Sequence, residues 1–437
     1  MMDTLDQLRR GALAGARRLD LSSGLQQIPP EVFELADSLE ILNLSGNQLS
    51  DLPDDLPRLK RLKVLFCSDN QFTHLPEVLG ACPALDIVGF KANRIAHVPG
   101  HALPPSLRWL ILTDNALGAL PVALGERPSL QKLMLAGNRL QTLPDSLAQA
   151  DKLALIRLSA NQMSAIPEWL TRLPCLSWLA LAGNPLGWHR LPAAPIPSVD
   201  WTALRIGPCL GEGASGQIFR VATASDATQP WALKLFKGDI TSDGLPEHEL
   251  AACLVAGAHP HLSTPVAELR GHPERKRGLL LPLIPDTYTN LAGPPSLDSC
   301  TRGVYANGFV LSPSTALRLA RQVAQAVGHL HARGVMHGDL YAHNVLWNPL
   351  NGDAVLGDLG AATLLPVDDE TIRSSLQALD VRAFGTLLEE LLAHSFALSG
   401  TAPQFWVEVM KACLNPLAAE RPSMQEVASY LAAVDLS

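Results

Sequence analysis

An asparagine recurs at intervals of 22 or 23 residues through the N-terminal half of the sequence. The positions are Asn47, Asn70, Asn93, Asn115, Asn138, Asn161 and Asn184. Each lies in a version of the frame L-x-L-x-x-N-x-L, and a proline follows each of the first six after six residues. One such unit is too short to bury its own leucines, so neighbouring units must stack to make a core. The pattern therefore predicts a solenoid with one short strand and one return segment per repeat.

This period and frame resemble those of leucine-rich repeats, over about residues 19–190. The resemblance implies that each asparagine amide hydrogen-bonds backbone groups at the turn. A degenerate first copy at Leu19–Leu25 lacks the asparagine, and with a helix in residues 1–18 it is expected to cap the open end. At the far end, Gly183–Trp188 is expected to close the array.

Apolar side chains occupy the strand positions between the core leucines, where they are expected to face the concave side of the arc. This concave stripe consists of Ile41, Val64, Phe66, Ile87, Trp109, Ile111, Met134, Leu155 and Trp178. Single surface hydrophobes are common, but a stripe of this length is more typical of a docking site. We expect the ligand to be another protein or the C-terminal half of this chain, with contacts at Phe66, Trp109, Met134 and Trp178.

The composition excludes several classes of protein. The 437 residues suffice for two or three domains, and 47% hydrophobic with 17% charged residues is typical of globular proteins. A net charge of −8 offers no electrostatic footprint for nucleic acid. The seven cysteines are scattered without a C-x-x-C pair, which argues against a zinc site or a disulfide framework and favours a reducing compartment. No apolar run approaches membrane-spanning length, so we expect a cytoplasmic protein.

Polar residues with metal-binding chemistry gather between Gly334 and Ala362. Two apolar runs, 344–347 and 354–356, are predicted to form strands joined by a turn at residues 351–352. Asp339 precedes the first strand and Asp358 follows the second. A hairpin would therefore bring both carboxylates and the Asn344 amide together, and such hard oxygen ligands suit Mg²⁺.

Residues 337–344, HGDLYAHN, resemble the H-R-D-L-x-x-x-N loop of protein kinases, and residues 358–360, DLG, resemble their D-F-G. Residues 210–218, LGEGASGQI, have G-x-G-x-x-G spacing. A dinucleotide-binding loop would open a helix, whereas the residues after Gly216 are predicted to form a strand. Residues 231–236, WALKLF, stand where the kinase pattern has V-A-I-K. The order of these motifs matches the family throughout.

The resemblance implies ATP and Mg²⁺ as ligands and assigns a role to each matching residue. Asp339 would orient and deprotonate the acceptor hydroxyl, while Asn344 and Asp358 would hold Mg²⁺. Lys234 would contact the nucleotide phosphates and pair with a glutamate on the next helix. We prefer Glu249 for that pair, with Glu247 as the alternative. The residues expected around the nucleotide are Gly211, Gly213, Ser215, Gly216, Ile218, Lys234 and Glu249.

The kinase resemblance covers about residues 205–435. Residues 279–285 fit the strand and hinge between the lobes, and 314–333 form a predicted amphipathic helix. Residues 380–385, DVRAFG, resemble the D-V-W-S-F-G that opens a large helix. The expected fold is an α/β leucine-rich repeat solenoid followed by an α+β bilobal protein-kinase-like domain. Its expected segments are a capping helix, the repeats, a Pro-rich linker and the kinase domain, at 1–18, 19–190, 191–200 and 201–437.

Several positions depart from the kinase pattern. Gly338 replaces the arginine of H-R-D, so activation by loop phosphorylation is not expected. Tyr341 stands where serine/threonine kinases carry lysine, and His343 where tyrosine kinases carry arginine. No A-P-E is present, which leaves Arg421 without its usual glutamate; an acid within 368–370 could substitute.

These features favour an ATP-dependent protein kinase, of serine/threonine type, that acts on protein substrates and uses its repeats for recognition or regulation. One alternative is a pseudokinase scaffold that binds protein partners. Another is a small-molecule phosphotransferase, because H-G-D-L-x-x-x-N also resembles the loop of aminoglycoside and choline kinases. Plant receptor kinases join the same two domains across a membrane span. Without an expected span, and with much Ala, Leu and Pro, this chain looks like an intracellular, bacterial repeat kinase.

Overall fold

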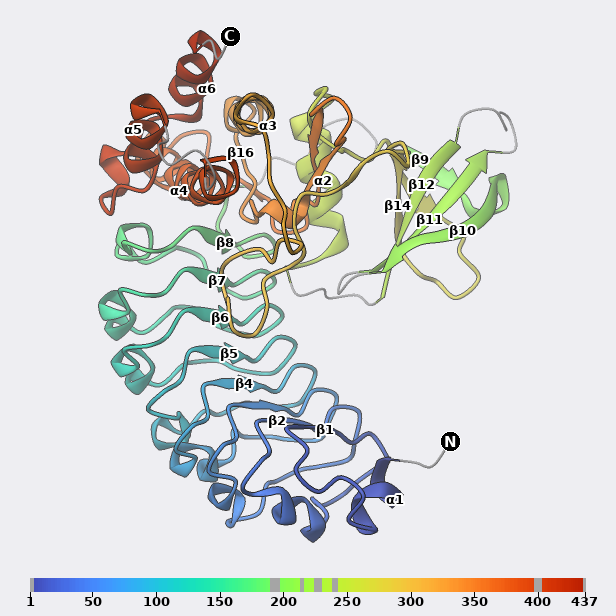
Figure 1. Ribbon diagram of the computed structural model, residues 1–437, viewed down its shortest axis with the longest axis vertical. Coiled ribbons are helices and arrows are strands. Elements are labelled where there is room, and N and C mark those ends of the chain that lie inside the picture. The colour runs from blue at the N-terminus through green and yellow to red at the C-terminus, as the bar shows by residue number, and fades with distance from the viewer. Residues whose placement is uncertain are drawn as a thin grey trace. The chain divides into compact units, whose positions relative to one another are not determined.

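A computed structural model of the chain describes residues 4–188, 197–212, 216–223, 230–237, 243–396 and 403–434. The chain divides into two compact units, Met1–Cys175 and Leu176–Ser437, and each is described by itself (Figure 1). The division falls inside the repeat array, so the last repeat strand belongs to the second unit. Among the described residues, no helix has the length and apolar character needed to cross a bilayer.

The first unit is a parallel sheet of very short strands that follow one another in chain order (Figure 1). The strands are β1 (Arg18–Asp20), β2 (Ile41–Asn43), β3 (Val64–Phe66), β4 (Ile87–Gly89), β5 (Trp109–Ile111), β6 (Lys132–Met134) and β7 (Leu155–Arg157). Helix α1 (Thr4–Arg9) precedes them. The middle residue of each strand, such as Leu42 or Leu133, is fully buried, which makes the solenoid core continuous.

Return segments of the first unit are short 3-10 helices. They are η1 (Pro30–Leu35), η2 (Leu56–Arg58), η3 (Glu77–Ala81), η4 (Gly100–Ala102), η5 (Val122–Glu126), η6 (Asp145–Gln149) and η7 (Leu170–Arg172). The recurring prolines of the sequence stand at the N-cap of η3 to η6. Proline suits this place because its φ is already restricted and its missing N–H costs the helix no hydrogen bond.

The repeating asparagines link neighbouring repeats, as the resemblance to leucine-rich repeats implies. The amide nitrogen of Asn138 donates to the carbonyls of Leu112 and Leu135, both at 2.9 Å. Its amide oxygen accepts the N–H of Leu117 at 3.0 Å. One buried side chain therefore satisfies three backbone groups at the turn, where no strand partner is available. Asn161 repeats the arrangement with the carbonyls of Leu135 and Leu158.

The second unit begins with β8 (Trp178–Ala180) and contains a six-stranded mixed sheet in the order β10-β11-β12-β14-β13-β9. The strands are β9 (Ser198–Asp200), β10 (Leu204–Glu212), β11 (Gly216–Thr223), β12 (Pro230–Phe236), β13 (Ala267–Arg270) and β14 (Gly278–Pro282). Leu233, Leu269 and Leu280 lie at the centre of the apolar cluster under this sheet. Helix α2 (Pro246–Ala256) follows β12 in the chain.

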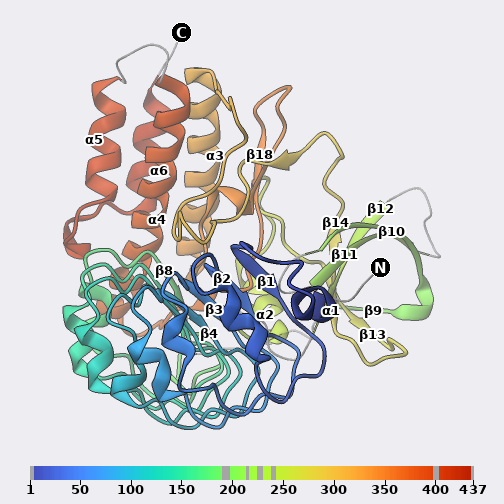
Figure 2. The same ribbon diagram turned by 60° about the horizontal axis from the view of Figure 1, so that its bottom comes forward.

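The remainder of the second unit is mainly helical. Its helices are α3 (Pro313–Ala332), α4 (Glu370–Phe396), α5 (Gln404–Cys413) and α6 (Met424–Ala433), with η8 (Trp201–Ala203), η9 (Ala342–Asn344) and η10 (Ala418–Glu420). Helix α3 packs against α6 and α4, and α4 packs against α5 (Figure 2). Ser312 caps α3 by accepting the N–H of Thr315, which explains why the helix begins there.

Two small sheets lie beside the helices of the second unit. One contains β15 (Thr289–Asn290), β17 (Val345–Trp347) and β18 (Ala354–Leu356), and the other contains β16 (Val335–Met336) and β19 (Thr363–Leu364). The β17–β18 pair is the hairpin expected from the sequence, with Val345 opposite Leu356.

Helix α4 corrects one expectation. The sequence pattern at 380–385 suggested that Asp380 opens the helix, but α4 begins at Glu370 and places Asp380 well inside it. The Asp369 carboxylate accepts the N–H of Ile372 at 2.9 Å and so caps the earlier start. An acid with a short side chain directly before the helical run, Asp369, was the signal for this cap.

Candidate active site

Lys234 is the centre of a buried charge cluster. It lies on β12, and its Nζ is 2.9 Å and 3.0 Å from the two carboxylate oxygens of Glu249 on α2. The same nitrogen is 3.3 Å from Oδ1 of Asp358, which follows β18. Glu247 instead pairs with Arg277 at 2.5 Å. The structure therefore brings together a strand lysine, a helix glutamate and the aspartate of the D-L-G turn.

Charge decides the protonation of this cluster. Burial alone would lower the pKa of Lys234, but the negative charges of Asp358 and Glu249 outweigh it and raise that pKa. The positive charge of Lys234 lowers the pKa of Asp358 despite its desolvation. Burial raises the pKa of Glu249, with Lys234 opposing the shift. The cluster thus holds a charged lysine beside a carboxylate that ionises readily.

Asp358 has an unusual backbone conformation. Its φ is 55°, in the left-handed region that residues other than glycine seldom occupy. Its Oδ1 accepts the N–H of Gly360 at 3.3 Å. An aspartate in this region is typical of a strained functional turn, because the conformation persists only when surrounding contacts maintain it.

Asn344 and Asp339 are joined directly in the loop that resembles H-R-D-L-x-x-x-N. Nδ2 of Asn344 donates to Oδ2 of Asp339 at 3.0 Å and to the Asp339 carbonyl at 2.8 Å. This arrangement uses the amide nitrogen and leaves the amide oxygen of Asn344 to accept from another group or to bind a cation.

His337 has a structural environment. Its backbone-side nitrogen Nδ1 accepts the N–H of Asp339 at 3.1 Å, so the proton is assigned to Nε2. Nε2 then donates to the carbonyl of Gly357 at 3.1 Å, and the side chain is fully buried. Both ring nitrogens are therefore engaged in tying the loop to the end of β18.

Asp380 anchors the backbone of the same loop through its carboxylate. Its carboxylate accepts the N–H of His337 at 2.7 Å and the N–H of Gly338 at 2.9 Å, and it contacts Nε2 of His331 at 3.0 Å. Burial opposes ionisation, but these hydrogen bonds and the nearby histidines lower the pKa of Asp380. We did not expect this role from the sequence, although the D-V-x-x-F-G match singled out the residue.

The glycine-rich segment is described only in part. Gly213 and Ser215 lie outside the described residues. A Cβ on Gly216 would lie 2.3 Å from the carbonyl of Leu235, so close strand packing already requires glycine there. Ile218 pairs across the sheet with Lys234 and therefore lies on the same face of the sheet. At Gly211, by contrast, no atom of the described residues lies within 4 Å of a Cβ.

Arg421 bonds to backbone groups within the helical part. Its guanidinium donates to the carbonyls of Ala378 and Asn415, both at 2.8 Å. Of the acids suggested as substitutes for the missing glutamate, Glu370 pairs with Arg373 at 2.6 Å and Asp369 caps α4. Arg421 thus ties the segment before α6 to α4 through main-chain acceptors.

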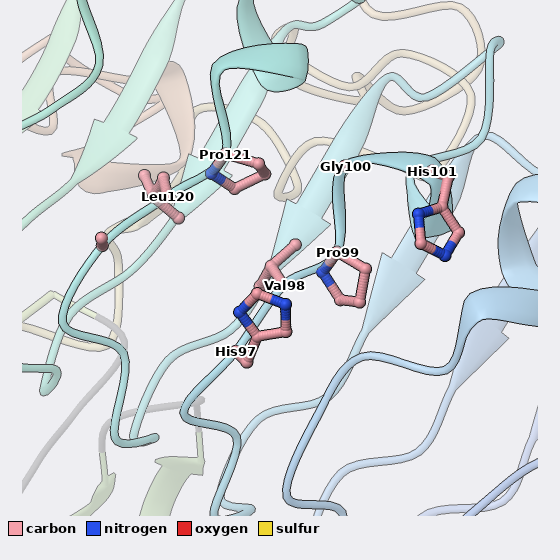
Figure 3. Close-up of a pocket in the computed structure, with 8 residues that line it drawn as sticks. His97, Val98, Pro99, Gly100, His101, Leu120 and Pro121 are labelled. Carbon is pink, nitrogen blue, oxygen red and sulfur yellow. The ribbon is translucent and has the colours of Figure 1, made fainter.

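A pocket of about 360 Å³ lies in the first unit, on its return segments (Figure 3). His97 and Pro99 come from one repeat and Leu120 and Pro121 from the next. Its lining holds no carboxylate, so it lacks the donors that a metal–phosphate site needs. The full lining consists of His97, Val98, Pro99, Gly100, His101, Ala119, Leu120 and Pro121.

The donor set of the second unit fits a magnesium site that is completed by a phosphate ligand. Asp358 supplies a carboxylate of lowered pKa, and Asn344 supplies an amide oxygen. Mg²⁺ is commonly held by one or two carboxylates together with waters and substrate phosphates, and not by a protein cage. The described residues hold no group of three or more His, Cys, Asp or Glu with metal-binding geometry.

A sheet lysine paired with a helix glutamate, above an aspartate–asparagine loop, defines a protein-kinase-like fold. Comparison with known families agrees: the protein kinase domain matches residues 204–383, the leucine rich repeat matches 128–186, and a two-copy leucine-rich repeat matches 37–77. The chain carries leucine-rich repeats followed by a protein kinase domain.

Curated relatives are kinases that share only part of this chain. A protein named cyclin-dependent kinase F-2 from Oryza sativa subsp. japonica is 36% identical over 156 residues, 35% of this chain and 44% of the relative. A protein named as a cyclin-dependent serine/threonine-protein kinase from Dictyostelium discoideum is 25% identical over 51% of this chain and 35% of its own length. Dual specificity testis-specific protein kinase 1 from Rattus norvegicus is 36% identical over 107 residues, 19% of this chain and 17% of the relative. The chain spans less than half the length of each.

Proposed function

We propose that the chain is an active protein kinase that transfers the γ-phosphoryl group of ATP to protein hydroxyl groups. The observation that carries this proposal is the Lys234 cluster, in which Nζ lies 2.9 Å from Glu249 and 3.3 Å from Asp358. A scaffold that had lost catalysis would have no need to hold a buried lysine between two carboxylates, since such burial is costly. Phosphoryl transfer depends mostly on positioning and charge neutralisation, which this cluster offers.

Each residue of the site has a proposed task. Lys234 binds the α- and β-phosphates, and Glu249 orients its ammonium group. Asp339 accepts the proton of the acceptor hydroxyl, and its bond to Asn344 holds its carboxylate in place. Ile218, together with the glycine-rich segment at Gly211, Gly213, Ser215 and Gly216, covers the nucleotide.

Asp358 and Asn344 are the proposed ligands of Mg²⁺. When bound, Mg²⁺ neutralises phosphate charge that develops during the transfer. Asp358 is suited to this task because Lys234 keeps its carboxylate ionised. Asn344 contributes its amide oxygen, since its nitrogen is already used toward Asp339.

We propose serine/threonine specificity and a recognition or regulatory role for the repeats. One relative is named a serine/threonine kinase and another a dual specificity kinase, which supports hydroxyl acceptors of this type. Phe66, Trp109 and Met134 lie half-buried on the repeat strands and would offer an apolar surface to a protein ligand. Other members of the expected concave stripe are buried, so the exposed stripe is shorter than the sequence indicated; these are Val64, Ile87, Leu155 and Trp178. None of the seven cysteines, all of which lie in the described part of the chain, forms a disulfide, which suits a reducing compartment such as the cytoplasm.

Phosphate transfer from radiolabelled ATP tests the proposal. The full chain is incubated with Mg²⁺ and generic protein substrates, and Asp339→Ala serves as the control. Label on protein that the control abolishes supports the proposal, and phosphoamino-acid analysis then separates serine/threonine from tyrosine. ATP binding without any transfer to protein would contradict it and would favour a scaffold or a small-molecule phosphotransferase.

A further inference from the structure

The last repeat strand packs on the catalytic loop inside the second unit. Trp178 of β8 stacks on Tyr341, with ring centroids 4.2 Å apart and ring planes 7° from parallel. Its indole Nε1–H donates to the carbonyl of Leu340 at 2.9 Å, and both Trp178 and Tyr341 are buried. A single side chain thus contacts both residues that follow Asp339.

A second contact binds the same repeat to the segment after the D-L-G turn. The N–H of Leu181 donates to Oγ1 of Thr363 at 3.2 Å. Thr363 is fully buried in β19 and pairs with Met336 of β16, directly ahead of the catalytic loop. The last repeat therefore contacts both the catalytic loop, at Leu340 and Tyr341, and the neighbouring strand β19, at Thr363.

Gly338 shows how closely the repeat approaches. A Cβ on Gly338 would lie 2.4 Å from the carbonyl oxygen of Leu179 and 2.9 Å from that of Ala361. The φ of Gly338 is +73°, which side chains also disfavour. The carbonyl of Leu179 in β8 thus fills the space that a side chain at position 338 would need. Position 338 is where the H-R-D pattern has its arginine.

We propose that the last repeat is a built-in support for the catalytic loop, with Trp178 as a positioning residue acting through Leu340 and Tyr341. The loop is held both by Asp380, which bonds His337 and Gly338, and by β8, which bonds Leu340. These contacts order the backbone of the loop, so it does not need an H-R-D arginine that binds a phosphate on the activation loop. The inference rests on the proposed kinase function and extends it to regulation: catalysis needs the repeat and needs no loop phosphate.

The geometry favours support over inhibition. The Trp178 contact is present in the same structure as the Lys234–Glu249 pair and the Asn344–Asp339 hydrogen bond. A contact that inhibited by distortion would be expected to break one of these. Here the parts needed for phosphate positioning remain assembled while Trp178 is in place.

Steady-state kinetics of the full chain test the proposal with Trp178→Ala and Trp178→Phe. We expect kcat to fall at least tenfold in Trp178→Ala while KM for ATP stays within twofold, because Trp178 is not among the contacts of Lys234. Phenylalanine retains a ring but lacks the indole N–H, so the kcat of Trp178→Phe should lie between those of the wild-type chain and Trp178→Ala. A rise in kcat would identify a blocking contact and overturn the proposal, as would an unchanged kcat.

Hydrogen exchange of residues 337–344 gives a readout that does not need activity. We expect faster exchange of these amides in Trp178→Ala, with α6 unaffected. If the wild-type chain transfers no phosphate but the loop still loosens, the proposed function fails and the support remains. If the wild-type chain is active and the loop exchanges at its normal rate in the variant, the support fails alone.

Two glycines provide a matched pair in case Trp178→Ala does not fold. Gly338→Ala should displace the repeat, because its Cβ would meet Leu179 at 2.4 Å. Gly334→Ala carries the same backbone penalty, with φ +72°, but its Cβ has no atom of the described chain within 4 Å. A larger loss of kcat and of loop protection in Gly338→Ala than in Gly334→Ala supports the proposal. Equal effects would overturn it.

Discussion

Asp380 accepts the backbone N–H of Gly338 at 2.9 Å, so a carboxylate from inside α4 fixes the loop that precedes Asp339. It also accepts the N–H of His337 and contacts His331. Three groups converge on one fully buried carboxylate. Buried carboxylates are tolerated when such hydrogen bonds replace their hydration, and here they also determine the position of the catalytic loop.

Replacing Asp380 by asparagine should weaken this anchor in a pH-dependent way. Because its folded pKa is lowered from the usual 3.8, the ionised carboxylate contributes stability that is fully present above that value. The contribution is lost as the pH falls through the lowered folded pKa. At neutral pH we expect Asp380→Asn to reduce the free energy of unfolding by about 2–3 kcal/mol, as charge-assisted hydrogen bonds are lost. Urea unfolding from pH 7 to pH 3 measures the gap, which should shrink in acid. A gap independent of pH would contradict the assignment.

Replacing Lys234 by methionine should abolish ATP binding and also destabilise the second unit. Glu249 would remain buried without its cation, and removing one partner of a buried pair costs about 3–5 kcal/mol. Isothermal titration with Mg²⁺ and ATP, together with denaturant unfolding, measures both effects.

Glu247→Gln is the matched control for this variant, because Glu247 pairs with Arg277 in a partly exposed site. An exposed pair contributes at most about 1 kcal/mol. Normal ATP affinity in Lys234→Met would remove Lys234 from the nucleotide site.

Replacing Thr363 by valine tests the contact between the last repeat and β19. Valine has nearly the same shape but no acceptor for the N–H of Leu181. An unsatisfied buried N–H costs about 1–3 kcal/mol, so the melting temperature should fall. Thr363→Ser keeps the hydroxyl and should lose less. If serine and valine destabilise equally, the hydrogen bond is not the source of the effect.

Replacing Asn138 by alanine should open the first unit locally. Its three backbone hydrogen bonds are buried. Their loss leaves the N–H of Leu117 without its acceptor and removes one of the two asparagine donors from each carbonyl of Leu112 and Leu135. We expect a loss of about 2–4 kcal/mol in the free energy of unfolding, summed from about 1 kcal/mol or more for each group. Asn43→Ala is the control, since half-buried Asn43 bonds to the Asp20 side chain and accepts only one backbone N–H, that of Ser45. Similar losses in both variants would contradict a particular contribution of the repeating asparagines to stability.

Much of the fold could be predicted because it is recorded at short range in the sequence. The repeat frame predicted the strands, since they follow from residue types at fixed spacing, and the resemblance to leucine-rich repeats implied the hydrogen bonds of Asn138. The hairpin after the catalytic loop was predicted from two apolar runs and a turn. The start of α4 was mistaken, because the helix signal near Asp369 is weak and the motif at Asp380 drew attention instead.

By itself, the sequence determined the two-part organisation and the residue types available for phosphate and metal chemistry. The sequence favoured Glu249 over Glu247 as the partner of Lys234, and the tertiary structure decided between them, since packing places Glu249 at Lys234 and Glu247 at Arg277. Only the tertiary structure shows why a glycine stands at position 338: the carbonyl of Leu179, distant in the sequence, fills the space that a side chain would need. Contacts at such sequence separation arise from how whole elements pack, and no local pattern of residues encodes them.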